Sequence, residues 1–153
     1  MTETILPAGE LIAAPLAAQT NPPHRILVAE DDADIRQLNT EILIGAGYHV
    51  DAAEDGAMAW DALQRNRYDL LVTDNLMPKV SGVELLKKLQ AARMALPVIM
   101  ATGNPPRETF ARHPGLRPTA TLLKPYTFDE LVRVVKAVLR ATAGFRELVV
   151  PSH

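Results

Sequence analysis

Short apolar stretches alternate with amphipathic segments along most of this chain, and this alternation constrains the fold more than any other feature. These stretches predict strands over 26–29, 69–73, 98–101 and 119–123, and the alternation of apolar and polar residues predicts a further short strand over 48–53. Apolar residues at helical spacing predict helices over 33–45, 57–66, 83–89, 107–113 and 127–141. Strand and helix in strict alternation, with short connections, predict an α/β fold with a parallel five-stranded sheet covered on both faces.

The composition excludes several classes of protein. A formal charge of −2 gives no general attraction to nucleic acid or to an anionic membrane surface, so we expect neither as a partner. The absence of cysteine excludes disulfides, zinc–thiolate sites and thiol catalysis. No apolar run reaches the roughly 18 residues that span a bilayer. No Lys or Arg precedes Arg25, so the positive start of a secretory signal is missing and we expect a cytoplasmic protein.

The same pattern divides the chain into three parts. Residues 1–24 contain four prolines among small and polar residues, and we expect a flexible N-terminal extension there. The domain is predicted to cover 25–141, and 142–153 to form a C-terminal tail. A chain of 153 residues has room for one such domain with a proper core.

Polar residues of one chemical set follow four of the predicted strands. Glu30 and Asp31 follow the first, Asp74 the third, Thr102 the fourth and Lys124 the fifth. Ligands of open α/β sheets bind in the crevice at the carboxyl ends of the strands, so these side chains are expected to converge there. The crevice would then hold three carboxylates, a hydroxyl and an ammonium group.

This set suits a hard metal ion and the transfer of a phosphoryl group. Carboxylate oxygens favour Mg²⁺, and acids this close together are costly without a cation among them. Asp74 is the candidate nucleophile, because a carboxylate can form an acyl phosphate. Thr102 and Lys124 can contact phosphoryl oxygens. The simpler interpretation, in which the acids after the first strand only cap a helix, applies to Asp32 or Asp34.

Four short motifs, taken together, resemble the receiver domain of two-component response regulators, the CheY-like family. They are Ile-Leu-Val-Ala-Glu-Asp-Asp at 26–32, Asp-Asn-Leu-Met-Pro at 74–78 with Ser81-Gly82, Ala-Thr-Gly at 101–103 and Leu-Lys-Pro at 123–125. Their order and spacing fit this family: 43 residues separate Asp31 from Asp74, 28 more lead to Thr102 and 22 more to Lys124. The resemblance covers about 25–141.

The resemblance implies a flavodoxin-like, doubly wound three-layer fold with strand order 2-1-3-4-5. It also implies that Asp74 accepts the phosphoryl group, with Thr102 and Lys124 binding its oxygens. Mg²⁺ would be held by Glu30, Asp31, Asp74 and the backbone carbonyl of Leu76. In this family the Lys-Pro bond, here Lys124–Pro125, is usually cis.

The implied function is signalling rather than turnover of an external substrate. A histidine kinase or a histidine phosphotransfer protein would donate the phosphoryl group to Asp74. Because 142–153 is too short for an output domain, we expect a stand-alone receiver whose output is a changed contact with a downstream protein. It would be no enzyme beyond its own phosphorylation and autodephosphorylation. A relay that passes the group onward is the alternative, and the sequence leaves monomer or phosphorylation-dependent dimer open.

Two departures from the family pattern keep other interpretations in view. Thr121 stands where the family usually has the aromatic residue that moves with Thr102, and 104–118 is rich in proline. A pseudo-receiver, which binds partners without phosphorylation, is the second alternative. A haloacid-dehalogenase-like phosphatase is the third: Asp32-Ala33-Asp34 matches its Asp-x-Asp motif, but the chain has no insertion large enough for a cap.

Overall fold

The structure is a computed structural model that describes residues 22–149. The predicted extension at 1–24 therefore lies almost entirely outside the described residues, as does the end of the predicted tail. Within the described part, no helix is both long enough and apolar enough to cross a bilayer.

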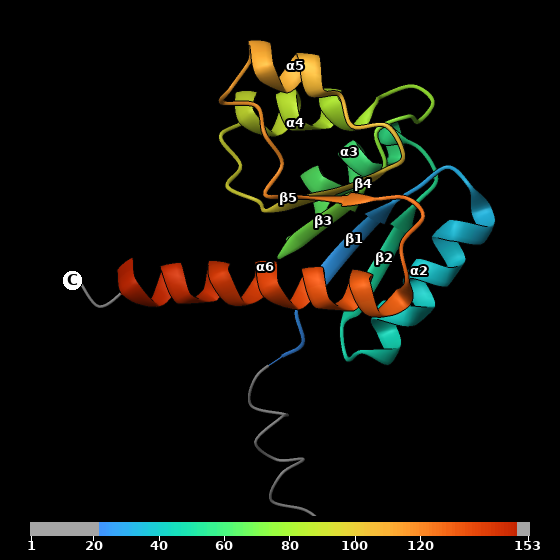
Figure 1. The fold of residues 1–153 in the computed structure, drawn as a ribbon. Coiled ribbons are helices and arrows are strands. Elements are labelled where there is room, and N and C mark those ends of the chain that lie inside the picture. The colour runs from blue at the N-terminus through green and yellow to red at the C-terminus, as the bar shows by residue number, and fades with distance from the viewer. Residues whose placement is uncertain (1–21, 150–153) are drawn as a thin grey trace, which may run out of the picture.

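Five parallel strands form one sheet in the order β2-β1-β3-β4-β5, as predicted (Figure 1). The strands are β1 (Arg25–Ala29), β2 (His49–Ala53), β3 (Leu70–Thr73), β4 (Val98–Thr102) and β5 (Ala120–Leu123). Every residue of β3 and β4 is buried, because helices cover both faces of the central strands. The order reverses next to β1, which places β1 and β3 side by side at the centre of the sheet.

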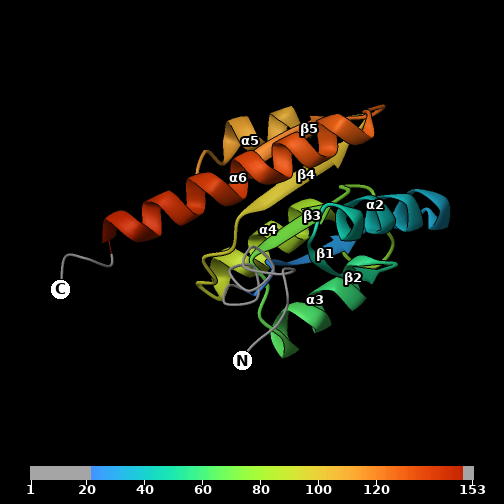
Figure 2. The same cartoon turned by 90° about the horizontal axis from the view of Figure 1, so that it is seen from below.

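The helices form the two outer layers. They are α2 (Ala33–Gly45), α3 (Gly56–Arg65), α4 (Gly82–Ala91), α5 (Arg107–Arg112) and α6 (Phe128–Val149). Residues of α2 and α6 pack with one face of the sheet, and residues of α3 and α4 with the other. Figure 1 shows α3 and α4 on one side of the sheet and α6 on the other, with the short α5 above α4; in the view of Figure 2, from below, α5 is seen beside β5 and α6.

Side-chain caps begin the helices directly after the strand ends. The Asp32 carboxylate accepts from the N–H groups of Asp34 and Ile35 at the start of α2, which confirms the capping expected of Asp32. Thr127 and Glu130 form the predicted reciprocal box at the start of α6. Ser81 and Glu84 do the same for α4. These caps keep the connections short, and so keep the residues after each strand near the sheet.

The last helix is longer than predicted. The apolar stripe predicted for this helix ends at Leu139, which led us to place the end of the helix near 141, but α6 continues to Val149. Figure 1 shows this end running past the sheet. Residues such as Ala143, Arg146 and Leu148 have high intrinsic helix propensity, so the helix can continue without a sheet to cover.

Candidate functional site

The predicted site residues meet at the carboxyl edge of the sheet. Lys124 follows β5, and its Nζ lies 2.9 Å from Oε1 of Glu30, which follows β1. The same Nζ lies 3.3 Å from Oδ2 of Asp74, which follows β3. Three strands that are far apart in the chain therefore contribute to one cluster of charges. The predicted cis bond between Lys124 and Pro125 is also present.

Three carboxylates form the acidic part of the site. Glu30, Asp31 and Asp74 each offer an oxygen within 4.8 Å of the other two. Glu30 and Asp74 are only 3% and 9% exposed, whereas Asp31 is open to solvent. With one ammonium for three carboxylates, the cluster carries excess negative charge. Hard oxygen donors with excess negative charge, one of them open to water, fit Mg²⁺.

Asp74 is held by the backbone around it. Its N–H donates to the carbonyl of Ala29 in β1 at 3.1 Å, and its Oδ1 accepts from the N–H of Asn75 at 2.7 Å. The start of α4 presses against this turn: a Cβ on Gly82 would lie 2.5 Å from the Asp74 carbonyl oxygen. Only glycine fits at position 82, which explains the Ser81-Gly82 pair in the motif.

Burial and neighbouring charges have opposite effects on the pKa values of Glu30 and Lys124. Burial raises the pKa of the Glu30 carboxyl above its ordinary value, although Lys124 and the N–H of Asp32 favour the ionised form. Burial works to lower the pKa of Lys124, but Glu30 and Asp74 outweigh it and raise the pKa. Lys124 is therefore a fixed positive charge at neutral pH, and the carboxylates around it are short of cations.

Thr102 and Leu76 lie at the same edge without joining the charged cluster directly. Thr102, the last residue of β4, is 1% exposed, and its Oγ1 accepts from the N–H of Asn104 at 3.3 Å. Leu76 lies two residues beyond Asp74, with its side chain 67% exposed. Its carbonyl as a metal ligand stays a prediction. Thr121, at the position of the missing aromatic residue, is exposed on β5.

Arg36 of α2 is a residue that the sequence analysis did not identify. Its Nη1 donates to the carbonyl oxygen of Glu30 at 2.9 Å and, at 3.4 Å, to that of Asp31. These two hydrogen bonds fix the backbone of the acidic loop, by which we mean the loop that carries Glu30 and Asp31. The sequence gives only a weak signal for this contact, a basic residue four positions after the capping residue Asp32.

A second unpredicted contact ties α2 to the loop that carries Lys124. The buried Asn39 amide donates to the hydroxyl of Tyr126 at 2.8 Å. Burial raises the pKa of Tyr126, so its hydroxyl keeps its proton at neutral pH. Because Asn39 and Tyr126 lie 87 residues apart, no local pattern could have paired them.

The doubly wound sheet and the acidic cluster with its lysine at the carboxyl edge together point to an α/β signalling domain of the receiver type. Residues 26–136 match the response regulator receiver domain family. The chain belongs to this family, as the motifs indicated.

Individual relatives agree with this assignment. The transcriptional regulatory protein RprY of Bacteroides fragilis is 32% identical over 120 residues, which cover 78% of this chain and 51% of RprY. The chain therefore spans about half the length of that relative. The response regulator receiver protein CpdR of Brucella abortus is 34% identical over 117 residues, which cover 76% of this chain and 98% of CpdR.

A solved structure has the same fold. The response regulator protein TrrA of Thermotoga maritima, determined in complex with Mg²⁺-BeF, superposes with a TM-score of 0.67. It is 30% identical, and the superposition covers 75% of this chain and 98% of TrrA. This similarity confirms the predicted CheY-like, flavodoxin-like fold.

Proposed function

We propose that this domain accepts a phosphoryl group on Asp74 from a phosphohistidine and signals through altered contacts with another protein. One observation carries the proposal: the Asp74 carboxylate is 9% exposed and lies 3.3 Å from the Lys124 ammonium, among two further acids. A carboxylate fixed beside one ammonium and an excess of negative charge is suited to forming an acyl phosphate once a cation is present.

The metal would be held by Glu30, Asp31 and Asp74, with the backbone carbonyl of Leu76 as a further ligand. Bound there, Mg²⁺ supplies positive charge that offsets the repulsion between the carboxylates and an incoming phosphoryl group. Arg36 holds the carbonyls of Glu30 and Asp31, so it keeps the acidic loop in place for the ion.

The transfer itself needs one bond to form and one to break. An Asp74 carboxylate oxygen forms a bond to phosphorus while the N–P bond of the donor breaks. The electron pair of that bond stays on the imidazole nitrogen of the donor. Lys124 and Thr102 bind the phosphoryl oxygens and stabilise their charge, which is the main contribution a protein makes to such a transfer.

The donor in this proposal is a histidine kinase or a histidine phosphotransfer protein, and the output is a contact with a downstream protein. The domain turns over no external substrate. Its only reactions are its own phosphorylation and the later attack of water on the Asp74 acyl phosphate, which returns the free carboxylate and releases phosphate.

The test is the intact mass of the purified protein after treatment with acetyl phosphate. We expect a gain of one phosphoryl group that requires Mg²⁺ and is absent from Asp74→Asn. Asp61→Asn, which removes an exposed carboxylate on α3, is the matched control and should gain the group normally. If the folded protein gains no mass with Mg²⁺, the proposal is wrong and the pseudo-receiver interpretation takes its place.

A further inference from the structure

A second recess lies away from the phosphoryl site, between α4 and the connection from α5 to β5. It has a volume of about 340 Å³. Lys87 and Gln90 line it from α4, and Arg112 and His113 line it from the end of α5, with Leu116 at its base. Three of these side chains are basic, and no acidic side chain lines the recess. We call it the basic groove.

The proline-rich segment that departs from the family pattern builds this groove. The chain turns back after α5 through Pro114 and Gly115, and the N–H of Leu116 donates to the carbonyl of His113 at 2.8 Å. Leu116 is 5% exposed and packs in the same core cluster as the inward face of α4. This anchor fixes Arg112 and His113 opposite Lys87.

The basic residues around the groove outnumber the acidic ones, although Glu84 of α4 interacts at longer range with the Lys87 charge. Residues 82–119 contain six Lys and Arg but only two Glu, although the whole chain has a formal charge of −2. Within residues 22–143, neither Lys87 nor Arg112 forms an ion pair, whereas Arg25 and Lys124 both do. Unpaired cations gathered around one recess attract an anionic ligand.

We propose that the basic groove binds an acidic segment of a partner polypeptide. Carboxylates of the segment pair with Lys87 and Arg112, the Gln90 amide bonds to its main chain, and an apolar side chain rests on Leu116. A polypeptide fits better than a nucleic acid, because the overall charge is negative and the cations surround one small recess rather than a long stripe. This binding goes beyond the proposed function, since it involves no residue of the phosphoryl site.

The test uses the full chain, labelled with ¹⁵N, and the peptide acetyl-Glu-Leu-Glu-Gly-Glu-Leu-Glu-amide as the probe. We expect the amide signals that shift on titration to be those of Lys87, Gln90 and the four residues with an N–H in the turn at 112–116, all except Pro114. The double variant Lys87→Glu/Arg112→Glu should bind about tenfold more weakly, since two exposed ion pairs become repulsive. The matched control Arg133→Glu/Lys136→Glu makes the same charge change at exposed positions of α6, and its binding should be nearly unchanged.

Several results would overturn the proposal. Equal weakening by both double variants would mean that only overall charge attracts the peptide. Equal binding of a peptide with Gln in place of Glu would show that the groove does not select carboxylates. If inorganic phosphate alone produced the same shifts at the same concentration, the groove would be a small-anion site. Lys87→Gln/Arg112→Gln provides the comparison if the reversed variant does not fold. Asp74→Asn should bind like the parent protein, which separates this result from the phosphorylation test.

Discussion

The two ends of β1 carry charged clusters of opposite design. At the amino end, Arg25 Nη2 lies 2.8 Å from Asp51 Oδ2, and the Tyr68 hydroxyl donates to the same oxygen at 2.7 Å. The Arg25 guanidinium also lies 5.1 Å from the centre of the Tyr68 ring. At the carboxyl end, Glu30 and its neighbours present three carboxylates to one lysine. One cluster is balanced and the other is not.

The amino-end cluster is held in a single protonation state. Burial, followed by the hydrogen bond to Asp51, raises the pKa of Tyr68 to about 12, so the hydroxyl keeps its proton. The Arg25 and Asp51 charges offset each other at this end, although Arg25 Nε is buried without a hydrogen-bond partner and the Asp69 carboxylate accepts from the Arg25 N–H at 2.8 Å. Only the carboxyl end needs a cation, and we infer that charge imbalance rather than charge density distinguishes the binding end of this sheet.

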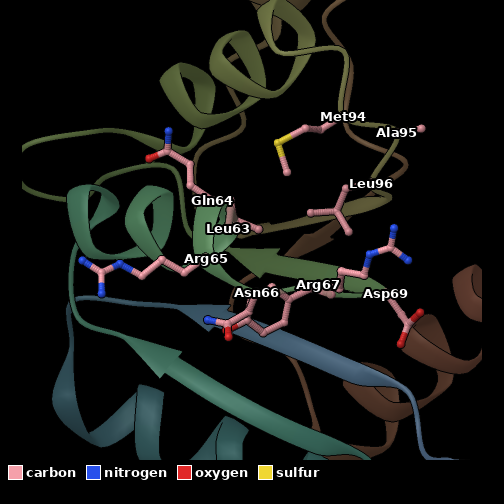
Figure 3. A pocket seen from close by; sticks show the side chains of 10 residues that line it. Leu63, Gln64, Arg65, Asn66, Arg67, Asp69, Met94, Ala95 and Leu96 are labelled. Carbon is pink, nitrogen blue, oxygen red and sulfur yellow. The ribbon is translucent and has the colours of Figure 1, made fainter.

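Cavity volume, in contrast to charge imbalance, would draw attention to the amino end of the sheet. A hollow of about 610 Å³ lies at the amino end, between the end of α3 and the chain leading into β4. Figure 3 shows Leu63, Met94 and Leu96 turned toward one another across it, while Asp69 lies at its border. Polar and apolar side chains both line this hollow, and none of the residues of the acidic cluster does, so volume alone would misplace the chemistry.

The largest expected effect comes from removing Lys124, the single cation of the cluster at the carboxyl end of β1. We expect Lys124→Met to slow phosphorylation by acetyl phosphate about 100-fold, because an ammonium aimed at the developing charge is lost. The rate is measured from a time course of intact mass. Lys88→Met, at an exposed lysine 5.6 Å from the Trp60 ring, is the control and should react at the parent rate. A normal rate for Lys124→Met would mean that the ammonium has no part in the transfer.

The next effect concerns the backbone support of the acidic loop. Arg36→Ala frees the carbonyls of Glu30 and Asp31, so we expect Mg²⁺ to bind about tenfold more weakly. Isothermal titration calorimetry with Mg²⁺ measures this directly. Arg65→Ala removes an arginine of α3 that pairs only with the exposed Asp61, and its affinity for Mg²⁺ should match that of the parent. Equal loss in both variants would point to overall charge instead.

At the balanced end, the expected effect is on stability and not on chemistry. Asp51→Asn removes the charged acceptor of both Arg25 and Tyr68, and should lower the free energy of unfolding by about 1 kcal/mol. Urea denaturation measures this change, with Asp61→Asn as the exposed control. Phosphorylation of Asp51→Asn should proceed normally, and a large loss of phosphorylation would contradict the separation of the two ends.

The smallest effect is the pH dependence of that stability. Burial alone would raise the pKa of Asp51, but hydrogen bonds from Tyr68 and Arg25 outweigh it and hold the pKa below its ordinary value. A lowered folded-state pKa gives stability that is present above the unfolded value, about 3.9, and is lost as the pH falls through the folded value. The stability difference between the parent and Asp51→Asn should therefore shrink below about pH 4. Urea titrations between pH 3 and 6 test this, and a constant difference would contradict it.

Much of the fold and the core of the site could be predicted from local patterns. The run from Leu70 to Val72 is apolar because β3 is buried on both faces, so the sequence indicates both the strand and the place near its end where the Asp74 side chain leaves the core. The same reasoning located Glu30 and Lys124. In each case the strand end fixes the backbone, and the backbone largely fixes where the side chain goes.

Other features depend on contacts that no local pattern encodes. The long side chain of Arg36 reaches the carbonyls of Glu30 and Asp31. Its rotamer depends on the residues around it in the folded protein, which the local sequence does not show. The hydrogen bond from the Asn39 amide to the Tyr126 hydroxyl joins segments that are far apart in the sequence. The end of α6 was misplaced because a buried stripe shows where a helix packs, and not where it stops.

The contact between Glu30 and Lys124 has a consequence for synthesis of the chain. The two residues lie 94 positions apart, and Lys124 belongs to the last of the five strands. A nascent chain that has not yet reached β5 possesses the acids and Asp74 but lacks the ammonium. If Asp74 accepts a phosphoryl group as proposed, full reactivity therefore requires the final strand to join the sheet. Unfinished chains would react as slowly as Lys124→Met, because both lack the ammonium.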